Sequence, residues 1–265
     1  TIIWRQGGAY NPPDRDVVGQ IAAGIREYDA DVLTTTHNAP ESAAMDYWGN
    51  ESWLTLNNVY TYGAVYSAAY QQYARSGPVP FFFVEGAYEY EQGASTVRLR
   101  TQAYHAVLSG AAGQLFGNNP IWHFNGPGIY SAPVTWKQAL NSPGSQSMTR
   151  LKQLFDTVDW WTLAPDTQSR LLTSGAGSGQ ERAVASLATD GSFALAYIPT
   201  IRNNTFNLNQ LAGPRVEATW YDPSNGTSVT ATGSPFTRSS ARTLRAPRNN
   251  AAGSGDWVLI LKSVP

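Results

Sequence analysis

The chain has 265 residues and a formal net charge of −1, with 18 Lys and Arg against 19 Asp and Glu. Without a cationic surplus it cannot hold a phosphate backbone through counterion release, so we expect no nucleic-acid partner. The absence of cysteine rules out disulfides, thiolate metal sites and cysteine nucleophiles. No apolar run approaches the length of a membrane span, so we expect no membrane partner.

The first 125 or so residues alternate short apolar runs with amphipathic stretches, which is the pattern of β-α units in a parallel sheet. Strands are predicted at residues 2–6, 31–36, 54–62 and 80–84, with a fifth strand region at 114–116 and 121–123. A closed (β/α)8 barrel needs eight strands. We therefore expect the C-terminal part of a TIM barrel, whose other strands come from a missing N-terminal half in the same precursor or another chain.

The last hundred residues follow an all-β pattern. Strands are predicted at 184–187, 193–198, 216–220 and 257–261, separated by turn signals at 190–191 and 222–226. The expected architecture is α/β plus all-β: part of a catalytic barrel over residues 1–163, then a small antiparallel β-sandwich over residues 164–265 that serves as an accessory domain.

Glu85 is the strongest candidate for a catalytic residue. It ends the apolar run 81–84, where a carboxylate lies at the carboxyl end of a parallel strand and is costly to bury unless function or a partner justifies it. The functional interpretation is a nucleophile. The alternative is a structural ion pair with Arg98 or Arg100.

Other polar and aromatic residues follow the predicted strands and suit sugar binding. These candidates are His37, Asn38, Asn58, Tyr60, Tyr88, Trp122 and His123. For His37 the competing interpretation is a histidine satisfied by backbone groups, and for Trp122 it is a core residue. The three histidines form no zinc motif and no phosphate loop occurs, so we predict neither a metal nor a cofactor.

Several segments together resemble the apiosidase-like glycoside hydrolases. In the first part they are residues 80–89 (PFFFVEGAYE), 97–113 and 116–122. In the second part, residues 154–166, 197–199, 220–223 and 256–259 resemble the β-sandwich that follows that barrel and is often labelled collagen-binding. The resemblance spans nearly the whole chain.

This resemblance implies a retaining mechanism, in which a glutamate after the seventh strand attacks the sugar and a carboxyl group after the fourth protonates the leaving oxygen. Glu85 falls on the nucleophile, and the strands present are then four to eight. The acid/base position falls on Ala9, which cannot transfer a proton. An engineered or natural inactivation ranks first as the explanation. The other explanation is a displaced carboxylate from the following set: Asp14, Asp16, Glu41 and Asp46.

The sequence therefore predicts a secreted retaining glycoside hydrolase that acts on plant or microbial oligo- or polysaccharide. The alternative, which Ala9 favours, is a catalytically inactive carbohydrate-binding or adhesive protein.

Overall fold

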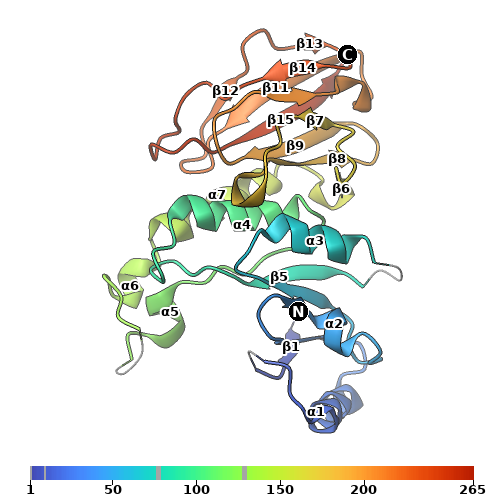
Figure 1. Ribbon diagram of the computed structural model, residues 1–265, viewed down its shortest axis with the longest axis vertical. Coiled ribbons are helices and arrows are strands. Elements are labelled where there is room, and N and C mark those ends of the chain that lie inside the picture. Colours follow the sequence, from blue (N-terminus) through green and yellow to red (C-terminus); the bar gives the residue numbers. More distant parts are fainter. Residues whose placement is uncertain (1, 9, 76–78, 127–129) are drawn as a thin grey trace.

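The computed structural model describes residues 2–8, 10–75, 79–126 and 130–265 (Figure 1). Its first part combines strands and helices in alternation. The strands are β1 (Ile3–Gln6), β2 (Leu33–Thr36), β3 (Ser42–Ala43), β4 (Asn57–Tyr60) and β5 (Phe81–Glu85). The helices are α1 (Arg15–Tyr28), α2 (Ala44–Trp48), α3 (Val65–Tyr73), α4 (Thr96–Val107), α5 (Asn119–His123), α6 (Trp136–Ala139) and α7 (Pro143–Phe155).

The longer strands of this part run in one direction. β1 pairs in parallel with β2, and β4 with β5. The backbone amide of Leu56 donates to the carbonyl of Thr34 at 3.0 Å, which brings β4 beside β2. Beyond β5, Phe83 makes a parallel bridge to Gln114. The carboxyl ends of these strands therefore meet at one edge, where polar side chains can gather. Among the described residues the strands form no closed barrel.

Side-chain caps fix the starts of several helices. Asp14 accepts from the first-turn amides of α1, and Ser95 and Ser142 do the same for α4 and α7. Such caps satisfy amides that a helix leaves without partners. α3 and α4 then cover the outer face of β4 and β5 through the cluster Val59, Val65, Ala69, Phe81, Phe83, Ala106 and Ala111. This packing keeps the strand ends in place.

The strand predicted at 114–116 and 121–123 is wrong. The first segment makes only the single bridge through Gln114, and residues 121–123 belong to α5. Pro120 lies in the first turn of this helix. A proline is well tolerated there because its missing N–H would have no partner, whereas it weakens a strand ladder. Trp122 and His123 are therefore helix residues.

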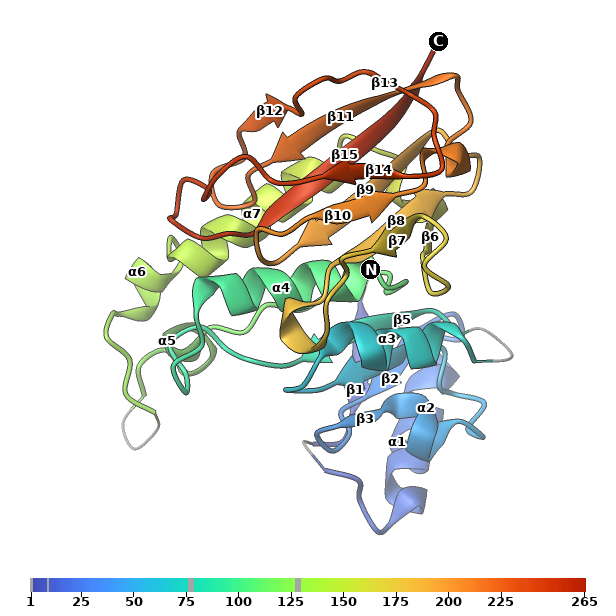
Figure 2. The ribbon, with the colours of Figure 1, turned by 45° about the horizontal axis from the view of Figure 1, so that its top comes forward.

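The second part is a sandwich of two antiparallel sheets (Figure 2). The larger sheet contains β6 (Leu163–Pro165), β8 (Val184–Ala188), β9 (Phe193–Ile198), β11 (Arg215–Tyr221), β12 (Ser228–Thr230), β13 (Phe236–Thr237) and β15 (Trp257–Val264). The smaller sheet contains β7 (Leu172–Ser174), β10 (Asn204–Phe206) and β14 (Arg242–Leu244). Short 3-10 helices lie at Trp160–Thr162, Gly179–Glu181 and Leu208–Gln210. Side chains such as Phe206 and Trp220 fill the space between the sheets.

The larger sheet also packs on the first part of the chain. Tyr104 and Leu108 of the α4 region, together with Leu154 and Phe155 of α7, lie against the outer face of this sheet. Figure 1 shows both helices between the sandwich and the parallel strands. The two parts consequently share one buried helical layer. Among the described helices, none is long and apolar enough to cross a membrane.

A buried ion pair crosses this layer. Arg100 on α4 is 1% exposed and Asp256, directly before β15, is fully buried. The guanidinium donates from Nε at 2.6 Å and from Nη2 at 2.8 Å to the two carboxylate oxygens. Arg98 instead donates to the backbone carbonyl of Tyr62. Both arginines proposed as structural partners of Glu85 are thus bonded elsewhere.

Candidate active site

The ends of three strands bring together His37, Tyr60 and Glu85. His37 directly follows β2, while Tyr60 and Glu85 are the last residues of β4 and β5. Nε2 of His37 lies 2.7 Å from Oε2 of Glu85, and the imidazole meets the Tyr60 ring edge-on at 5.5 Å between centroids. An ionised carboxylate can only accept, so Nε2 carries the hydrogen of this bond.

The surroundings of Glu85 favour its ionised form. Partial burial alone raises the pKa of this carboxyl group. The hydrogen bond and charge of His37, a hydrogen bond from Tyr88 and the charge of Arg5 oppose burial, and together they bring the pKa below its ordinary value. The side chain stays 15% exposed. Glu85 is therefore a reachable carboxylate that is negatively charged at neutral pH, as a nucleophile must be.

Two tyrosines next to this carboxylate keep their protons. Burial, a hydrogen bond with Tyr62 and the negative charge of Glu85 all raise the pKa of Tyr60. Burial and Glu85 likewise raise the pKa of Tyr88. A phenol that stays neutral remains a hydrogen-bond donor, so these hydroxyls can orient the carboxylate or bind a sugar oxygen.

Asn38 and Asn58 are fully buried behind the strand ends. Nδ2 of Asn38 donates to the carbonyl and hydroxyl of Ser42, both at 2.9 Å. Nδ2 of Asn58 donates to Thr35 Oγ1 and to the carbonyl of Thr36. The prediction that these amides contact sugar does not fit their burial, because neither side chain reaches the surface. They hold β2, β3 and β4 in register.

Trp122 and His123 lie on α5, at some remove along the chain from Glu85. Trp122 is 47% exposed, which excludes the core interpretation, and its indole Nε1 donates to Glu91 at 3.0 Å. Glu91 lines a small pocket of about 50 Å³ together with Tyr88. His123 bonds to Asn119 Oδ1 at 2.8 Å. Trp122 is thus exposed and bonded to the loop that carries Tyr88, and its ring makes a T-shaped contact with that of His123.

The structure adds two residues that the sequence reasoning missed. Arg5 on β1 contributes positive charge to Glu85, and the Tyr62 hydroxyl bonds that of Tyr60 at 3.0 Å. The sequence does contain a signal for Arg5. A charged side chain directly after three apolar residues of a strand indicates that it has a specific partner. Alternation places Arg5 on the same face of β1 as Ile3, opposite Trp4.

The position of the missing acid/base residue, Ala9, lies outside the described residues. Three of the four carboxylates considered as its replacement have other partners. Asp14 caps α1, and Asp16 lies exposed in the first turn of that helix. Glu41 accepts from Thr61 and from the amide of Tyr62, and Asp46 pairs with Arg75. These bonds argue against Asp14, Glu41 and Asp46 as the displaced carboxylate.

Within the part of the chain that the structure describes, no cluster of three or more His, Asp or Glu side chains is placed to hold a metal ion. The chemistry available at these strand ends is that of a carboxylate, an imidazole and phenols.

Solved structures similar to this chain belong to glycoside hydrolases. One is a glycoside hydrolase family 5 protein from Bacteroides vulgatus, 23% identical with a TM-score of 0.86, matched over 98% of this chain and 62% of its own. Another, described as a glycoside hydrolase, is 22% identical with a TM-score of 0.85, over 98% and 64% of the two chains. The present chain therefore spans less than two thirds of either structure. At this identity the likeness establishes the fold.

Family comparison defines the chain more closely. Residues 1–162 match the family described as "Apiosidase-like, catalytic domain", and residues 165–262 match the "Putative collagen-binding domain of a collagenase". The chain belongs to the apiosidase-like family. No curated protein matches it.

Proposed function

We propose that this chain carries the nucleophile of a retaining glycoside hydrolase, and that the nucleophile is Glu85. In this mechanism the carboxylate attacks the anomeric carbon and forms a glycosyl-enzyme ester, which water then hydrolyses. The substrate class is an oligo- or polysaccharide of plant or microbial origin, and the enzyme acts outside the cell, in keeping with a chain in which only 14% of residues are charged.

The observation that carries the proposal is the setting of Glu85. It is an ionised, partly exposed carboxylate at a strand end, tied by His37 and flanked by neutral tyrosine hydroxyls. A structural carboxylate in an apolar strand would be expected to pair with a buried arginine. The buried Arg100 pairs instead with Asp256.

We propose further that the parallel strands are strands four to eight of a (β/α)8 barrel, closed by three strands from elsewhere. Ile3 and Leu33 are inward-facing by alternation and are 47% and 37% exposed. Trp4, on the other face of β1, is 43% exposed. Apolar side chains on both faces of an edge strand favour a covering partner. Residues 164–265 would then form the rigid accessory sandwich.

Trapping the glycosyl-enzyme tests this function. The chain, expressed together with the N-terminal half of its barrel, is treated with activated 2-fluoro-glycosides of several sugars, and the labelled peptide is identified by mass spectrometry. We expect the label on Glu85 and none in Glu85→Gln. Label on another residue, or equal labelling of Glu85→Gln, would show that the nucleophile lies elsewhere.

Ala9 supports the second candidate, a binding or adhesive protein that has lost its catalytic acid. Retaining enzymes place their two carboxyl groups about 5 Å apart, and alanine leaves one of them absent. Turnover on a glycan panel by this chain and by Ala9→Asp, each paired with the N-terminal half, separates the candidates. Turnover only in Ala9→Asp indicates an inactivated hydrolase, and turnover in neither, with glycan binding retained, indicates a binding protein.

A further inference from the structure

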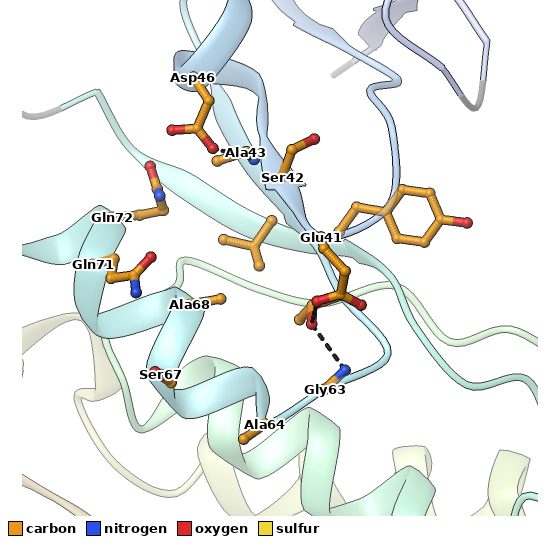
Figure 3. Close-up of a pocket in the computed structure, with 13 residues that line it drawn as sticks. Glu41, Ser42, Ala43, Asp46, Gly63, Ala64, Ser67, Ala68, Gln71 and Gln72 are labelled. Carbon is orange, nitrogen blue, oxygen red and sulfur yellow. Dashed lines mark hydrogen bonds between the residues drawn. The ribbon is translucent and has the colours of Figure 1, made fainter.

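A second pocket lies on the helix-covered side of β4 (Figure 3). Val59 packs toward α3, whereas the next side chain, Tyr60, lies beside His37. Tyr60 also lines the pocket, but successive side chains of a strand point to opposite faces, so β4 separates the pocket from the Tyr60 ring and from Glu85. It lies between β3, β4, α2 and α3 and has a volume of about 300 Å³.

Neutral hydrogen-bonding groups dominate the walls of this pocket. Hydroxyls and amides come from Ser42, Ser67, Gln71 and Gln72, and small apolar surfaces come from Val59, Ala64 and Ala68. Figure 3 shows Ser67, Ala68, Gln71 and Gln72 along one side of the hollow, on α3. Walls that alternate polar and small apolar groups suit a ligand with many hydroxyls and exposed C–H surfaces.

A carboxylate stands at each end of the pocket. Glu41 has a left-handed backbone with φ of 58°, a conformation that costs a non-glycine residue free energy and often marks functional positions. Its oxygens accept from Thr61 Oγ1 at 2.5 Å and from the amide of Tyr62 at 2.7 Å. At the other end, Asp46 accepts from the amide of Ala43 at 2.8 Å and pairs with Arg75. The negative charge of Glu41 disfavours an anionic ligand.

Gln72 supplies a nearly buried donor. Its side chain is 9% exposed, and its Oε1 accepts from Asn57 Nδ2 at 3.0 Å. Its Nε2 remains accessible as a donor on the pocket wall. A ligand oxygen in the pocket could accept a hydrogen bond from it.

We propose that this pocket binds a single neutral sugar residue, at a site separate from the one that contains Glu85. The volume is at the lower limit for ligand pockets, which start at about 300 Å³, so one ring fits better than a longer chain. Sugar hydroxyls would donate to Glu41 and Asp46 and accept from Gln72, and ring C–H groups would lie on Ala64 and Ala68. The choice of a sugar as ligand rests in part on the proposed function.

Titration followed by NMR tests the site. Glu85→Gln protein, in which turnover is blocked, is titrated with D-galactose, D-xylose, L-arabinose, D-galacturonate and D-galactosamine. We expect a neutral sugar to shift the backbone amides of Gly63, Ala64 and Ala68 with a Kd on the order of 1 mM to 10 mM. D-galacturonate should bind at least about tenfold more weakly than the neutral sugar, because of the negative charge of Glu41.

A matched pair of variants localises the binding. Ala68→Leu places a larger side chain in the pocket and should weaken the neutral sugar at least about tenfold. Ala23→Leu makes the same change at an exposed position of α1 and should leave the Kd unchanged. If thermal melting shows that Ala68→Leu does not fold, Gln71→Ala replaces it, since that side chain is exposed.

Three results would overturn the proposal: no neutral sugar shifts these amides, the shifts survive in Ala68→Leu or Gln71→Ala, or D-galactosamine alone binds, which would make this a cation site. None of them bears on the labelling of Glu85. Conversely, sugar binding here in a protein that never labels on Glu85 would leave the pocket assigned and the proposed hydrolase function rejected.

Discussion

His37 and Glu85 are 48 residues apart in the chain, yet Nε2 and Oε2 lie 2.7 Å from each other across the carboxyl ends of β2 and β5. β4 lies between these strands, and its last residue, Tyr60, packs edge-on against the imidazole. One oxygen of the candidate nucleophile is thereby fixed in direction. A fixed carboxylate loses little freedom on attack, which favours the chemical step.

The first prediction concerns the pH dependence of activity in His37→Ala. Burial raises the pKa of Glu85, and the bond and charge of His37 are the leading contributions that lower it. Without His37 the pKa should rise, so the acid limb of kcat/KM should move to higher pH by about one unit. The pH profile of the complete enzyme, chain plus N-terminal half, measures this shift on an aryl glycoside whose activated leaving group needs no catalytic acid.

His37→Gln is the matched control for that experiment, since its amide can donate one hydrogen bond but carries no charge. Its acid limb should lie between those of the parent and His37→Ala. The same lowered pKa affects stability. Because the pKa of Glu85 is lower in the folded protein than in the unfolded chain, this group stabilises the fold above pH 4.5, and that stability is lost as pH falls through the folded pKa. An unmoved acid limb in His37→Ala would mean that Glu85 does not set it.

The position of Glu85 could be predicted from the sequence because its signals are local. An apolar run that ends in a carboxylate places that carboxylate at a strand end, and the strand was predicted at 80–84 and found at Phe81–Glu85. The same logic located His37 after β2 and Tyr60 on β4. Alternation and strand direction are enough to gather such residues at one edge.

What could not be predicted depends on contacts between distant parts of the chain. Arg100 was a candidate partner for Glu85, but its partner Asp256 is 156 residues away. Sequence spacing gives no information on that distance. Residues 121–123 are apolar and aromatic, which suits a strand or a helix equally. In the folded chain they form a helix. Asn38 and Asn58 were expected to bind sugar, because the sequence does not show which strand-end amides the fold buries.

The second prediction concerns the buried pair of Arg100 and Asp256. Asp256→Asn removes the charge that compensates Arg100 and should lower the free energy of unfolding by about 3 to 5 kcal/mol. Urea denaturation followed by tryptophan fluorescence measures the loss. The double variant Arg100→Met with Asp256→Leu should recover most of it, because no buried charge is left alone. Equal losses in the single and double variants would contradict this account of the pair.

The third prediction concerns Gly144 in the first turn of α7. A Cβ at this position would lie 2.5 Å from Glu89 Oε2 and 2.9 Å from Leu99 Cδ1, and Glu89 is held there by the amide of Gly144 and the hydroxyl of Ser142. Gly144→Ala should therefore destabilise the protein by about 1 to 3 kcal/mol.

Gly24 in α1 provides the control for Gly144→Ala, since it is also helical and a Cβ there meets nothing within 4 Å. Gly24→Ala should stabilise the protein by about 0.5 to 1 kcal/mol through helix propensity. The urea denaturation midpoints of both variants measure these two changes in stability. Equal stabilisation by the two alanines would show that Glu89 and Leu99 can move aside without cost.

The last prediction concerns His105, which is buried on α4 and bonded through Nε2 to the carbonyl of Arg182 at 2.8 Å. Burial lowers its pKa from 6.5 to about 4. Between these values the unfolded chain binds a proton that the folded protein does not, so stability falls as pH falls below 6.5. At 1.36 kcal/mol per pKa unit, this group should remove about 2 kcal/mol of stability between pH 7.5 and pH 5.

His105→Gln tests that expectation, because glutamine is neutral throughout this range and can donate to the Arg182 carbonyl. Its free energy of unfolding should lose about 2 kcal/mol less than the parent's between the two pH values, whatever the variant costs at pH 7.5. His123→Gln, a change at a partly exposed histidine, should keep the parent's pH dependence. If His105→Gln loses as much stability at pH 5 as the parent does, the acid sensitivity comes from other groups, and the buried imidazole is protonated without unfolding the helix around it.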